Sequence, residues 1–458
     1  MARGTKRAGA QLGLILVVAL LAGCNVGDDG SADGRGQSPL DSEAREDGGQ
    51  TRWARTIRSA GGSDAPVATA HDGQGNVLTL GNHLTPIDFG EGPVGTPSGS
   101  SVLVVSKYAS DGALMWVRLL QVPKSNGSAF VRGQTLAVDS QDTVWLTGVH
   151  SGGLNLAGVA LPKGPFLARF DTNGQPLWAK SLPTTVTELA VSPHGDLILA
   201  GVMSGNVNFG NGPIHQRNNH PFVVRYGPEG TLRWVYVDST RGTPMDLAQD
   251  DAGDVYLVGG RLLPQSPLLS PFLTRLSAEG QLQWTRHLEG ASGLMMSVAA
   301  HGNHVAVSGY FTGSTLFLDK PLLAPTTRGF VLTYGKDGSE RWGFLLGSTW
   351  GMVAMDQGSG LVIAGRYAAG EDFGLGLGEL DGFLGSTNLY VLRLQRPTGR
   401  AQWIRTYPSA SALPVDLAVT RHGASTLVGT FRAEVDFGTG GPLTPGPGAN
   451  TFILQLEK

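Results

Sequence analysis

The chain has 458 residues, of which Gly and Pro together make up about a fifth, and only 16% are charged. Long amphipathic helices need charged outer faces and few helix breakers, so this composition argues against a mostly helical protein. A hydrophobic content of 41% is sufficient for a buried core and excludes a disordered polymer. Many short strands joined by tight turns, as in sandwiches, barrels and propellers, fit these numbers best.

The formal net charge of −3 is unevenly distributed along the chain. The first 24 residues carry Arg3, Lys6 and Arg7, whereas residues 25–50 carry seven acids and two arginines. Residues 51–458 are left with a net charge of −1. Because this part lacks the basic field that phosphate backbones attract, we do not expect nucleic acid as a partner.

The N-terminus has basic residues followed by an apolar run, the order that is typical of an export signal. Its three basic residues precede an apolar run from Leu12 to Ala22, which is too short to span a bilayer as a stable helix. The run ends at the sequence LAGC, residues 21–24, and Cys24 is the only cysteine in the chain. This tetrapeptide resembles the lipobox of bacterial lipoproteins.

The resemblance implies that residues 1–23 are a signal peptide that is removed. The thiol of Cys24 then receives a diacylglycerol, and the new amino terminus is acylated by a fatty acid such as palmitate. In that family an Asp after the Cys favours the inner membrane, so Asn25 favours the outer membrane, facing either the periplasm or the exterior. The alternative is a plain signal or signal anchor in which Cys24 is an ordinary residue.

The segment from Cys24 to residue 50 is expected to be an acylated Cys followed by a flexible acidic tether. It contains two aliphatic residues, Val26 and Leu40, and therefore cannot bury enough surface to fold. A Gly-rich coil of this length spans about 25 to 30 Å. That distance lifts a domain clear of lipid headgroups.

Tryptophan shows an internal repeat in residues 51–458. Seven of the nine tryptophans follow one another at intervals of 63, 62, 56, 50, 58 and 61 residues. Trp145 and Trp350 lie outside this register. The seven register tryptophans, which we interpret as structural anchors of the repeat, are Trp53, Trp116, Trp178, Trp234, Trp284, Trp342 and Trp403.

Each repeat predicts four strands. An Ala/Val-rich strand and a strand ending in Gly are followed by a strand of the type FVxR and, after a Gly-containing turn, by the strand that carries Trp. Examples of the last two are FLARFDTNGQPLW (166–178), FVVRYGPEGTLRW (222–234) and FLTRLSAEGQLQW (272–284). Small hairpins such as VNFGNGPI (207–214) separate the second and third strands in most repeats, and the fourth repeat lacks one.

Seven units of four strands predict an all-β fold, a seven-bladed β-propeller, because radial blades protect their edges and crowd small residues near the axis. The folded part begins with a Trp strand, residues 51–58, and ends with an FVxR-type strand, residues 451–458. We therefore predict that residues 51–58 complete the last blade and close the ring. At this point the units resemble the bacterial seven-bladed propeller repeat, which occurs in secreted and surface proteins of differing function.

Four histidines, His71, His194, His301 and His422, occupy turns between first and second strands. They belong to different blades, too far apart to share one metal ion, so we interpret them as turn residues; only His301 and His304 are close in sequence. Acidic turns such as residues 250–254 and 139–142 lack the EF-hand spacing and leave incidental calcium binding open. No metal or cofactor is expected.

The sequence contains no nucleophile elbow, HExxH or phosphate-binding loop, and it shows no cluster of acids and histidines. The turn before each Trp differs from the sialidase Asp box in its spacing. A basic residue recurs in the third strand of several repeats and is expected to have a structural role, such as pairing with a neighbouring blade. These positions are Lys107, Arg169, Arg225, Arg275 and Arg393.

The sequence thus predicts a monomeric, lipid-anchored, extracytoplasmic propeller without enzymatic activity, which binds a protein or glycan on one of its faces. One alternative is a propeller hydrolase that acts on carbohydrate or lactone with acids near the central channel. Another is a scaffold of outer-membrane assembly, similar to the propeller lipoprotein of the barrel-assembly machinery, although repeats there are nearer forty residues. A third is a purely structural envelope component.

Overall fold

The computed structural model describes residues 48–59, 65–95, 101–122, 129–263, 268–386, 388–409, 411–446 and 448–458. Every regular element in these ranges is a β-strand, and none of their residues forms a helix that could cross a membrane. Residues 1–47, with Cys24, the predicted signal peptide and most of the predicted tether, lie outside the described residues. Lipid attachment therefore stays a prediction.

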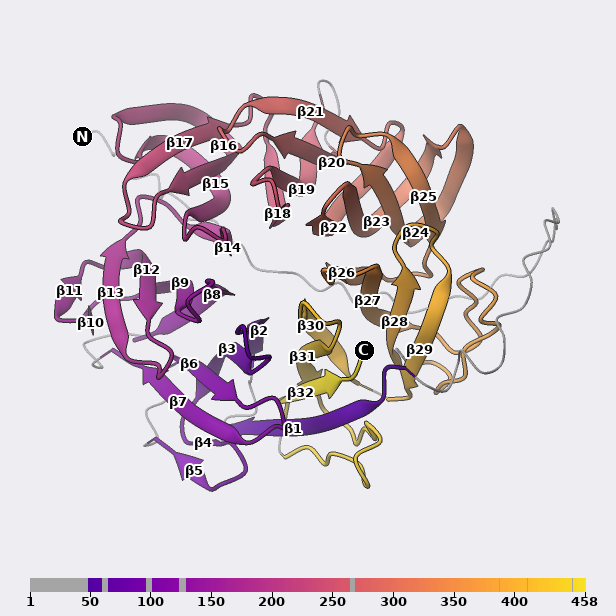
Figure 1. The fold of residues 1–458 in the computed structure, drawn as a ribbon, viewed down its shortest axis with the longest axis horizontal. Coiled ribbons are helices and arrows are strands. Elements are labelled where there is room, and N and C mark those ends of the chain that lie inside the picture. The colour runs from indigo at the N-terminus through magenta and orange to yellow at the C-terminus, as the bar shows by residue number, and fades with distance from the viewer. Residues whose placement is uncertain are drawn as a thin grey trace, which may run out of the picture. The chain divides into compact units, whose positions relative to one another are not determined.

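Seven sheets form a ring of blades around a central channel, which confirms the predicted seven-bladed propeller (Figure 1). Each blade has four antiparallel strands that run in order from the channel to the rim. The inner strands of blades 1 to 7 are β2 (Ala65–His71), β8 (Val131–Val138), β14 (Val186–Val191), β18 (Gly242–Gln249), β22 (Ala291–His301), β26 (Gly351–Met355) and β30 (Leu413–Val419). The second strands are β3 (Val77–Leu84), β9 (Val144–His150), β15 (Leu197–Asn208), β19 (Val255–Leu262), β23 (His304–Phe317), β27 (Gly360–Tyr367) and β31 (Ser425–Phe431).

The outer half of each blade contains the FVxR-type strand and the Trp strand. The third strands are β6 (Ser101–Tyr108), β12 (Gly164–Phe170), β16 (Pro213–Tyr226), β20 (Leu269–Leu276), β24 (Lys320–Gly335), β28 (Asn388–Gln395) and β32 (Asn450–Leu456). The outer strands are β7 (Leu114–Leu120), β13 (Pro176–Ser181), β17 (Leu232–Val237), β21 (Leu282–His287), β25 (Glu340–Leu345), β29 (Ala401–Tyr407) and β1 (Thr51–Ser59). All seven register tryptophans lie in these outer strands.

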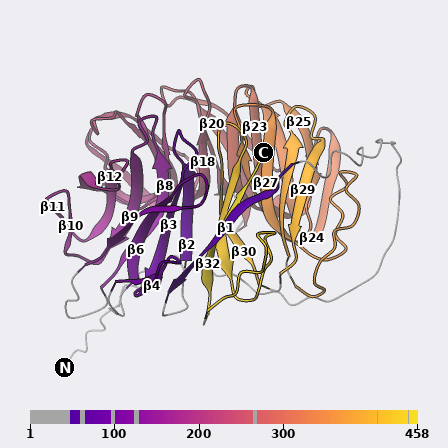
Figure 2. The same cartoon turned by 60° about the horizontal axis from the view of Figure 1, so that its bottom comes forward.

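The N-terminal strand closes the ring as predicted. Strand β1 pairs antiparallel with β32, with Thr51 opposite Leu456 and Ile57 opposite Thr451. Figure 2 shows β1 lying along the last blade. Its far end also pairs with the short strand β4 (Ile87–Asp88) of blade 1. One strand thus completes blade 7 and joins it to blade 1, which leaves no unpaired edge at the seam.

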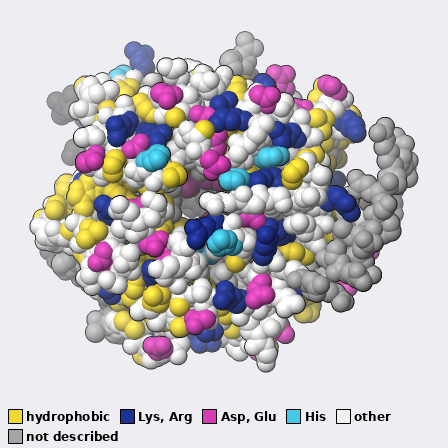
Figure 3. Space-filling model, viewed as in Figure 1, with side chains coloured by type: hydrophobic (Ala, Val, Ile, Leu, Met, Phe, Trp, Pro, Cys, Tyr) yellow, Lys and Arg dark blue, Asp and Glu magenta, His cyan; other side chains and the backbone are white. Residues whose placement is uncertain are grey.

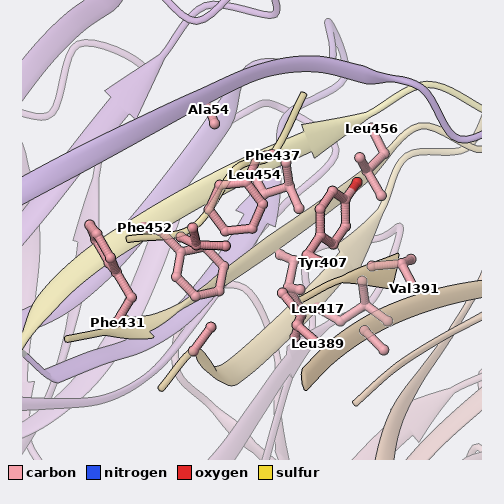
Figure 4. Close-up of a cluster of buried hydrophobic side chains, with 14 of the residues drawn as sticks. Ala54, Leu389, Val391, Tyr407, Leu417, Phe431, Phe437, Phe452, Leu454 and Leu456 are labelled. Atoms are coloured by element: carbon pink, nitrogen blue, oxygen red, sulfur yellow. The ribbon is translucent and has the colours of Figure 1, made fainter. Parts of the chain in front are cut away.

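The core consists of apolar layers between neighbouring blades. Figure 4 shows the layer between blades 6 and 7, where Tyr407 of β29 lies near Phe437 and Leu456 of the last blade. Ala54 of the closing strand belongs to the same cluster. Each blade therefore buries one sheet face against each neighbour, and the ring needs all seven to exclude water from its core.

Hairpins between the second and third strands supply the apolar side chains that fill the widening gap at the rim. In blade 3, Phe209 of the hairpin is 5% exposed, and its ring centroid lies 4.9 Å from that of Phe222. In blade 7, Phe437 is fully buried, 5.0 Å from Phe452. The other hairpins place a buried apolar residue in the same way: Phe89, Leu156, Phe317 and Phe373.

The tryptophans hold neighbouring blades together. The indole Nε1 of Trp234 in blade 3 donates to the carbonyl of Ala278, in the turn between the third and outer strands of blade 4, at 2.8 Å. The same turn contains Gly280, whose φ of +80° requires glycine; a Cβ there would lie 2.4 Å from the Trp234 ring. The GxxxW periodicity in the sequence therefore reflects a glycine that packs on the tryptophan of the preceding blade.

Candidate functional site

The channel wall is built from the inner strands, and a single residue position repeats there in all seven blades. Small side chains are needed where seven strands approach one axis, and each inner strand places an alanine at this position. These residues are Ala70, Ala137, Ala190, Ala248, Ala299, Ala354 and Ala418. The ring of alanines matches the predicted Ala/Val-rich first strand.

Two residues before each alanine, the blades differ from one another. A β-bulge precedes this position in six of the seven inner strands, for example between Pro244 and Asp246. The bulge turns the following side chain toward the neighbouring blade and the channel. The residues at this level are Ala68, Thr135, Glu188, Asp246, Ser297, Met352 and Asp416. Three blades, the third, fourth and seventh, thus contribute a carboxylate to one level of the channel.

Two of these carboxylates are fixed by backbone donors of the next blade. Asp246 accepts the N–H of Val298 in blade 5 at 2.8 Å, and its other oxygen accepts the N–H of Leu247 at 2.7 Å. Asp416 repeats this arrangement across the seam, because it accepts the N–H of Thr69 in blade 1 at 2.7 Å. Both carboxylates are therefore rigid parts of the channel wall.

The three carboxylates repel one another inside the channel, where each side chain is partly buried. Burial and the charge of Asp416 raise the pKa of Asp246 to about 7, even though two backbone N–H groups favour its ionised form. Burial raises the pKa of Asp416 to about 6. Burial and the charges of Asp246 and Asp416 raise the pKa of Glu188 well above its usual range. At neutral pH the channel therefore holds a negative charge on Asp416 and a partial charge on Asp246.

A cavity of about 300 Å³ runs along this part of the channel. Asp246, Asp416 and Ser297 line one end of it, and Met355 and Val419, at the ends of their inner strands, line the other. Figure 3 shows the channel as a hollow at the centre of the face on which these strands end. A small group can thus reach the carboxylates from this face.

The histidines singled out in the sequence do not converge on the channel acids. His71 at the end of β2 has its Nε2 atom 2.7 Å from the hydroxyl of Thr426 in blade 7. His301 bonds Asp251 at 3.1 Å, and His422 accepts from Arg421 at 2.9 Å. Within the described ranges, no group of three or more His, Cys, Asp and Glu side chains is arranged to hold a metal ion.

In the acidic turns, the Asp carboxylates accept hydrogen bonds from backbone N–H groups of the same turn. Asp139 accepts the N–H groups of Gln141 and Thr143 at 2.9 and 3.0 Å, and Asp250 accepts those of Ala252 and Asp254, both at 3.0 Å. These are the bonds of Asx turns. Bonds from Thr143 and Trp145 help to hold the pKa of Asp139 below its usual range.

The recurrent basic residues of the third strands pair within their own blade. Arg225 lies 2.9 Å from Asp196 in the turn that precedes the second strand, and the Lys107 ammonium lies 2.8 Å from Asp72. Arg225 also donates to the carbonyl of Ala278 in the next blade at 3.1 Å. The expected contact between blades therefore exists, but it is a hydrogen bond to a carbonyl and not an ion pair.

No family model matches the chain, and no curated protein matches it. Among solved structures, a catalytically inactive virginiamycin B lyase from Staphylococcus aureus with quinupristin has a TM-score of 0.47 and 10% identity, over 89% of this chain and 99% of that one. Kuenenia stuttgartiensis hydrazine synthase has a TM-score of 0.46 and 11% identity, over 79% of this chain and 92% of that one. The Dos1 propeller has a TM-score of 0.44 and 8% identity, over 89% and 95%. These proteins differ in function, and at such identities they indicate no activity for this chain.

The channel carboxylates were missed in the sequence. The sequence predicted no cluster of acids and histidines; Glu188, Asp246 and Asp416 come from distant repeats and reach one level of the channel only when the ring closes. A signal was present: the pattern acid-Leu-Ala occurs at residues 188–190, 246–248 and 416–418, always in the inner strand. Aligning the seven inner strands would have placed the three acids at one level.

Proposed function

We propose that this chain is a lipid-anchored, extracytoplasmic binding platform of the bacterial cell envelope, and that its partner places a cationic group in the central channel. The channel carboxylates carry this proposal. Asp246 and Asp416 line one cavity, Glu188 lies at the same level of the neighbouring inner strand, and an ammonium group would offset the repulsion between the carboxylates. A lysine or terminal amine of a protein and an amino sugar of a glycan share this chemistry.

The bonds of the carboxylates favour binding over catalysis. A general acid needs a neutral carboxyl near the substrate, whereas the N–H groups on Asp246 and Asp416 favour the ionised form. Ionised and immobile carboxylates suit recognition of a cation. We therefore propose that the protein is not an enzyme.

Titration with cadaverine, a small diamine, tests the channel as a binding site. We expect cadaverine to bind at pH 8, where Asp246 and Asp416 are ionised, and to bind more weakly as the pH falls through about 7 and about 6. The triple variant Glu188→Gln, Asp246→Asn, Asp416→Asn should lose this binding. The control variant Glu91→Gln removes an exposed acid from a blade 1 hairpin and should bind as the unmodified chain does. Equal binding by the triple variant would refute the proposal.

The anchor is proposed from the sequence alone. The apolar run, the LAGC tetrapeptide and Asn25 support acylation at Cys24 and the outer membrane. Labelling of cells with a radioactive palmitate should mark the protein, and Cys24→Ala should abolish both the label and sedimentation with membranes. Retention of the label in Cys24→Ala would exclude this anchor, and protease treatment of intact cells then distinguishes the periplasm from the exterior.

A second candidate function is hydrolysis of a carbohydrate or lactone. The observation that favours it is that Asp246 and Asp416 line one cavity and that the pKa of Asp246 is raised to about 7, which lets its carboxyl donate a proton near neutral pH. Nitrophenyl glycosides and simple lactones serve as probes. Turnover that disappears in Asp246→Asn would establish the enzyme and overturn the binding proposal.

A further inference from the structure

The turn between the inner and second strands contains a carboxylate in five of the seven blades, and this carboxylate pairs with a basic residue of the third strand. In blade 3, a carboxylate oxygen of Asp196 lies 2.9 Å from the guanidinium of Arg225. The guanidinium of Arg233, the residue before the register Trp in the outer strand, lies 3.6 Å from the other oxygen. In blade 4, the Asp254 carboxylate forms an ion pair with Arg275 at 2.5 Å. The acids that pair in this way are Asp72, Asp139, Asp196, Asp254 and Asp356.

Blade 5 departs from this pattern. Its turn is His301-Gly302-Asn303-His304, so histidines stand at both ends, where blade 4 has Asp250 and Asp254. The third strand of blade 5 has the neutral Thr333 at the basic position, but its outer strand has Arg341 before the register Trp342, as Arg233 precedes Trp234. Blade 7 also lacks the turn acid and likewise has a neutral residue, Gln455, at the basic position of its third strand.

Arg341 points at the turn as its counterpart in blade 3 does. Its guanidinium lies 2.9 Å from Nδ1 of His304, to which it donates. Among the described residues, no carboxylate lies within ion-pair distance of Arg341, and the exposed Asp337 is influenced by it only at longer range. Blade 5 thus has the outer-strand cation of blade 3 without the carboxylate that Arg233 contacts there.

Other groups around His304 add positive charge. Arg396, which follows β28 of blade 6, is 7% exposed and donates to the carbonyls of Asp356 and Gly358, not to a carboxylate. His301 faces the turn of blade 4 and bonds Asp251. Burial, Arg341, Arg396 and His301 together lower the pKa of His304 to about 4. An anion near His304 would be attracted by two guanidinium groups.

We propose that Arg341 and His304 form an anion-binding site on the turn side of blade 5, which takes a carboxylate or phosphate group of a ligand in place of the missing turn carboxylate. The site lies outside the channel and is independent of the channel proposal. Both half-buried side chains remain accessible, and the guanidinium offers the two-pronged geometry that such anions accept. Because a bound anion favours the imidazolium form of His304, binding takes up more protons as the pH falls toward the pKa of about 4 of this side chain.

Calorimetric titration of the full chain with inorganic phosphate and with acetate tests this site. We expect Arg341→Gln to weaken binding at least about tenfold, which corresponds to about 1.4 kcal/mol. His304→Asp restores the turn acid of blades 3 and 4 and should abolish binding while raising the melting temperature. Arg233→Gln is the matched control, because its arginine already has Asp196 as a partner, and binding there should be unchanged.

The outcomes separate the possibilities. Binding of phosphate alone assigns a phosphate ligand, and equal binding of acetate assigns a carboxylate. Proton uptake, measured in two buffers of different ionisation enthalpy, should vanish in His304→Asp. Failure of both probes to bind the unmodified chain, or equal weakening by Arg233→Gln and Arg341→Gln, would overturn the proposal. Neither result bears on cadaverine binding in the channel.

Discussion

The channel carboxylates predict an unusual dependence of stability on pH. A carboxyl whose pKa is raised by folding binds its proton more tightly in the folded state, so its ionisation destabilises the fold. Stability is then fully present below pH 3.8 and is lost as the pH rises through 6 and 7. The paired turn acids act in the opposite direction, because their pKa values are lowered, and their contribution is lost only as the pH falls below about 4.

The size of the effect follows from the two pKa values. Asp246 is raised from 3.8 to about 7 and Asp416 from 3.8 to about 6, and one unit corresponds to about 1.4 kcal/mol. Single contributions would be about 4 and about 3 kcal/mol. Because the two acids repel each other, these contributions overlap, and we expect the pair to cost about 4 kcal/mol of unfolding free energy between pH 4 and pH 8.

Urea unfolding at several pH values, followed by tryptophan fluorescence, measures this cost. The double variant Asp246→Asn, Asp416→Asn should gain stability relative to the unmodified chain as the pH rises, by about 4 kcal/mol between pH 4 and pH 8. The hydrogen bonds that asparagine alters are altered at every pH, so they do not contribute to the change of the stability difference with pH. Glu91→Gln should leave the pH profile unchanged. If the unfolding free energies of the double variant and the unmodified chain changed with pH in parallel, the reasoning would be refuted.

Three further predictions concern the scaffold and are read from thermal unfolding. Deleting residues 51–58 removes the closing strand and should sharply lower the melting temperature and the cooperativity of unfolding; a truncated chain that melts like the full one would contradict ring closure. Gly280→Ala should destabilise more than Gly230→Ala, because both have a φ of +80° but only the first Cβ would overlap a tryptophan ring; equal losses would disprove a role for this packing. Phe437→Ala should cost about 3 to 5 kcal/mol, whereas Phe383→Ala, 56% exposed, should cost little; similar losses would show that the rim hairpin does not fill the blade interface.

The blade architecture was predictable because its determinants are local. Each tryptophan, its preceding glycine and the alternation within each strand recur along the chain, and the two incomplete repeats at residues 51–58 and 451–458 indicated closure. The rim hairpins were visible as sequence, but their role in filling the gap between blades depends on the wedge shape of the assembled ring. This shape is a property of the fold and not of any one repeat.

The candidate sites were harder to predict because they are exceptions to the repeat. Glu188, Asp246 and Asp416 are separated by 58 and 170 residues and meet through the ring geometry alone. His304 was noticed as a neighbour of His301, but its meaning depends on Arg341, which reaches it from the outer strand. In a repeat protein, the positions that break the pattern have to be compared across all blades before a site can be recognised.

Proton release on binding of cadaverine at pH 6.5 tests the central claim most directly. At this pH Asp246 and Asp416 are partly protonated, so a cation bound between them must displace protons into solution. Calorimetry in two buffers of different ionisation enthalpy should show proton release that falls to zero in the triple carboxylate variant. Binding without proton release, or release that persists in the variant, would contradict a binding site in the channel.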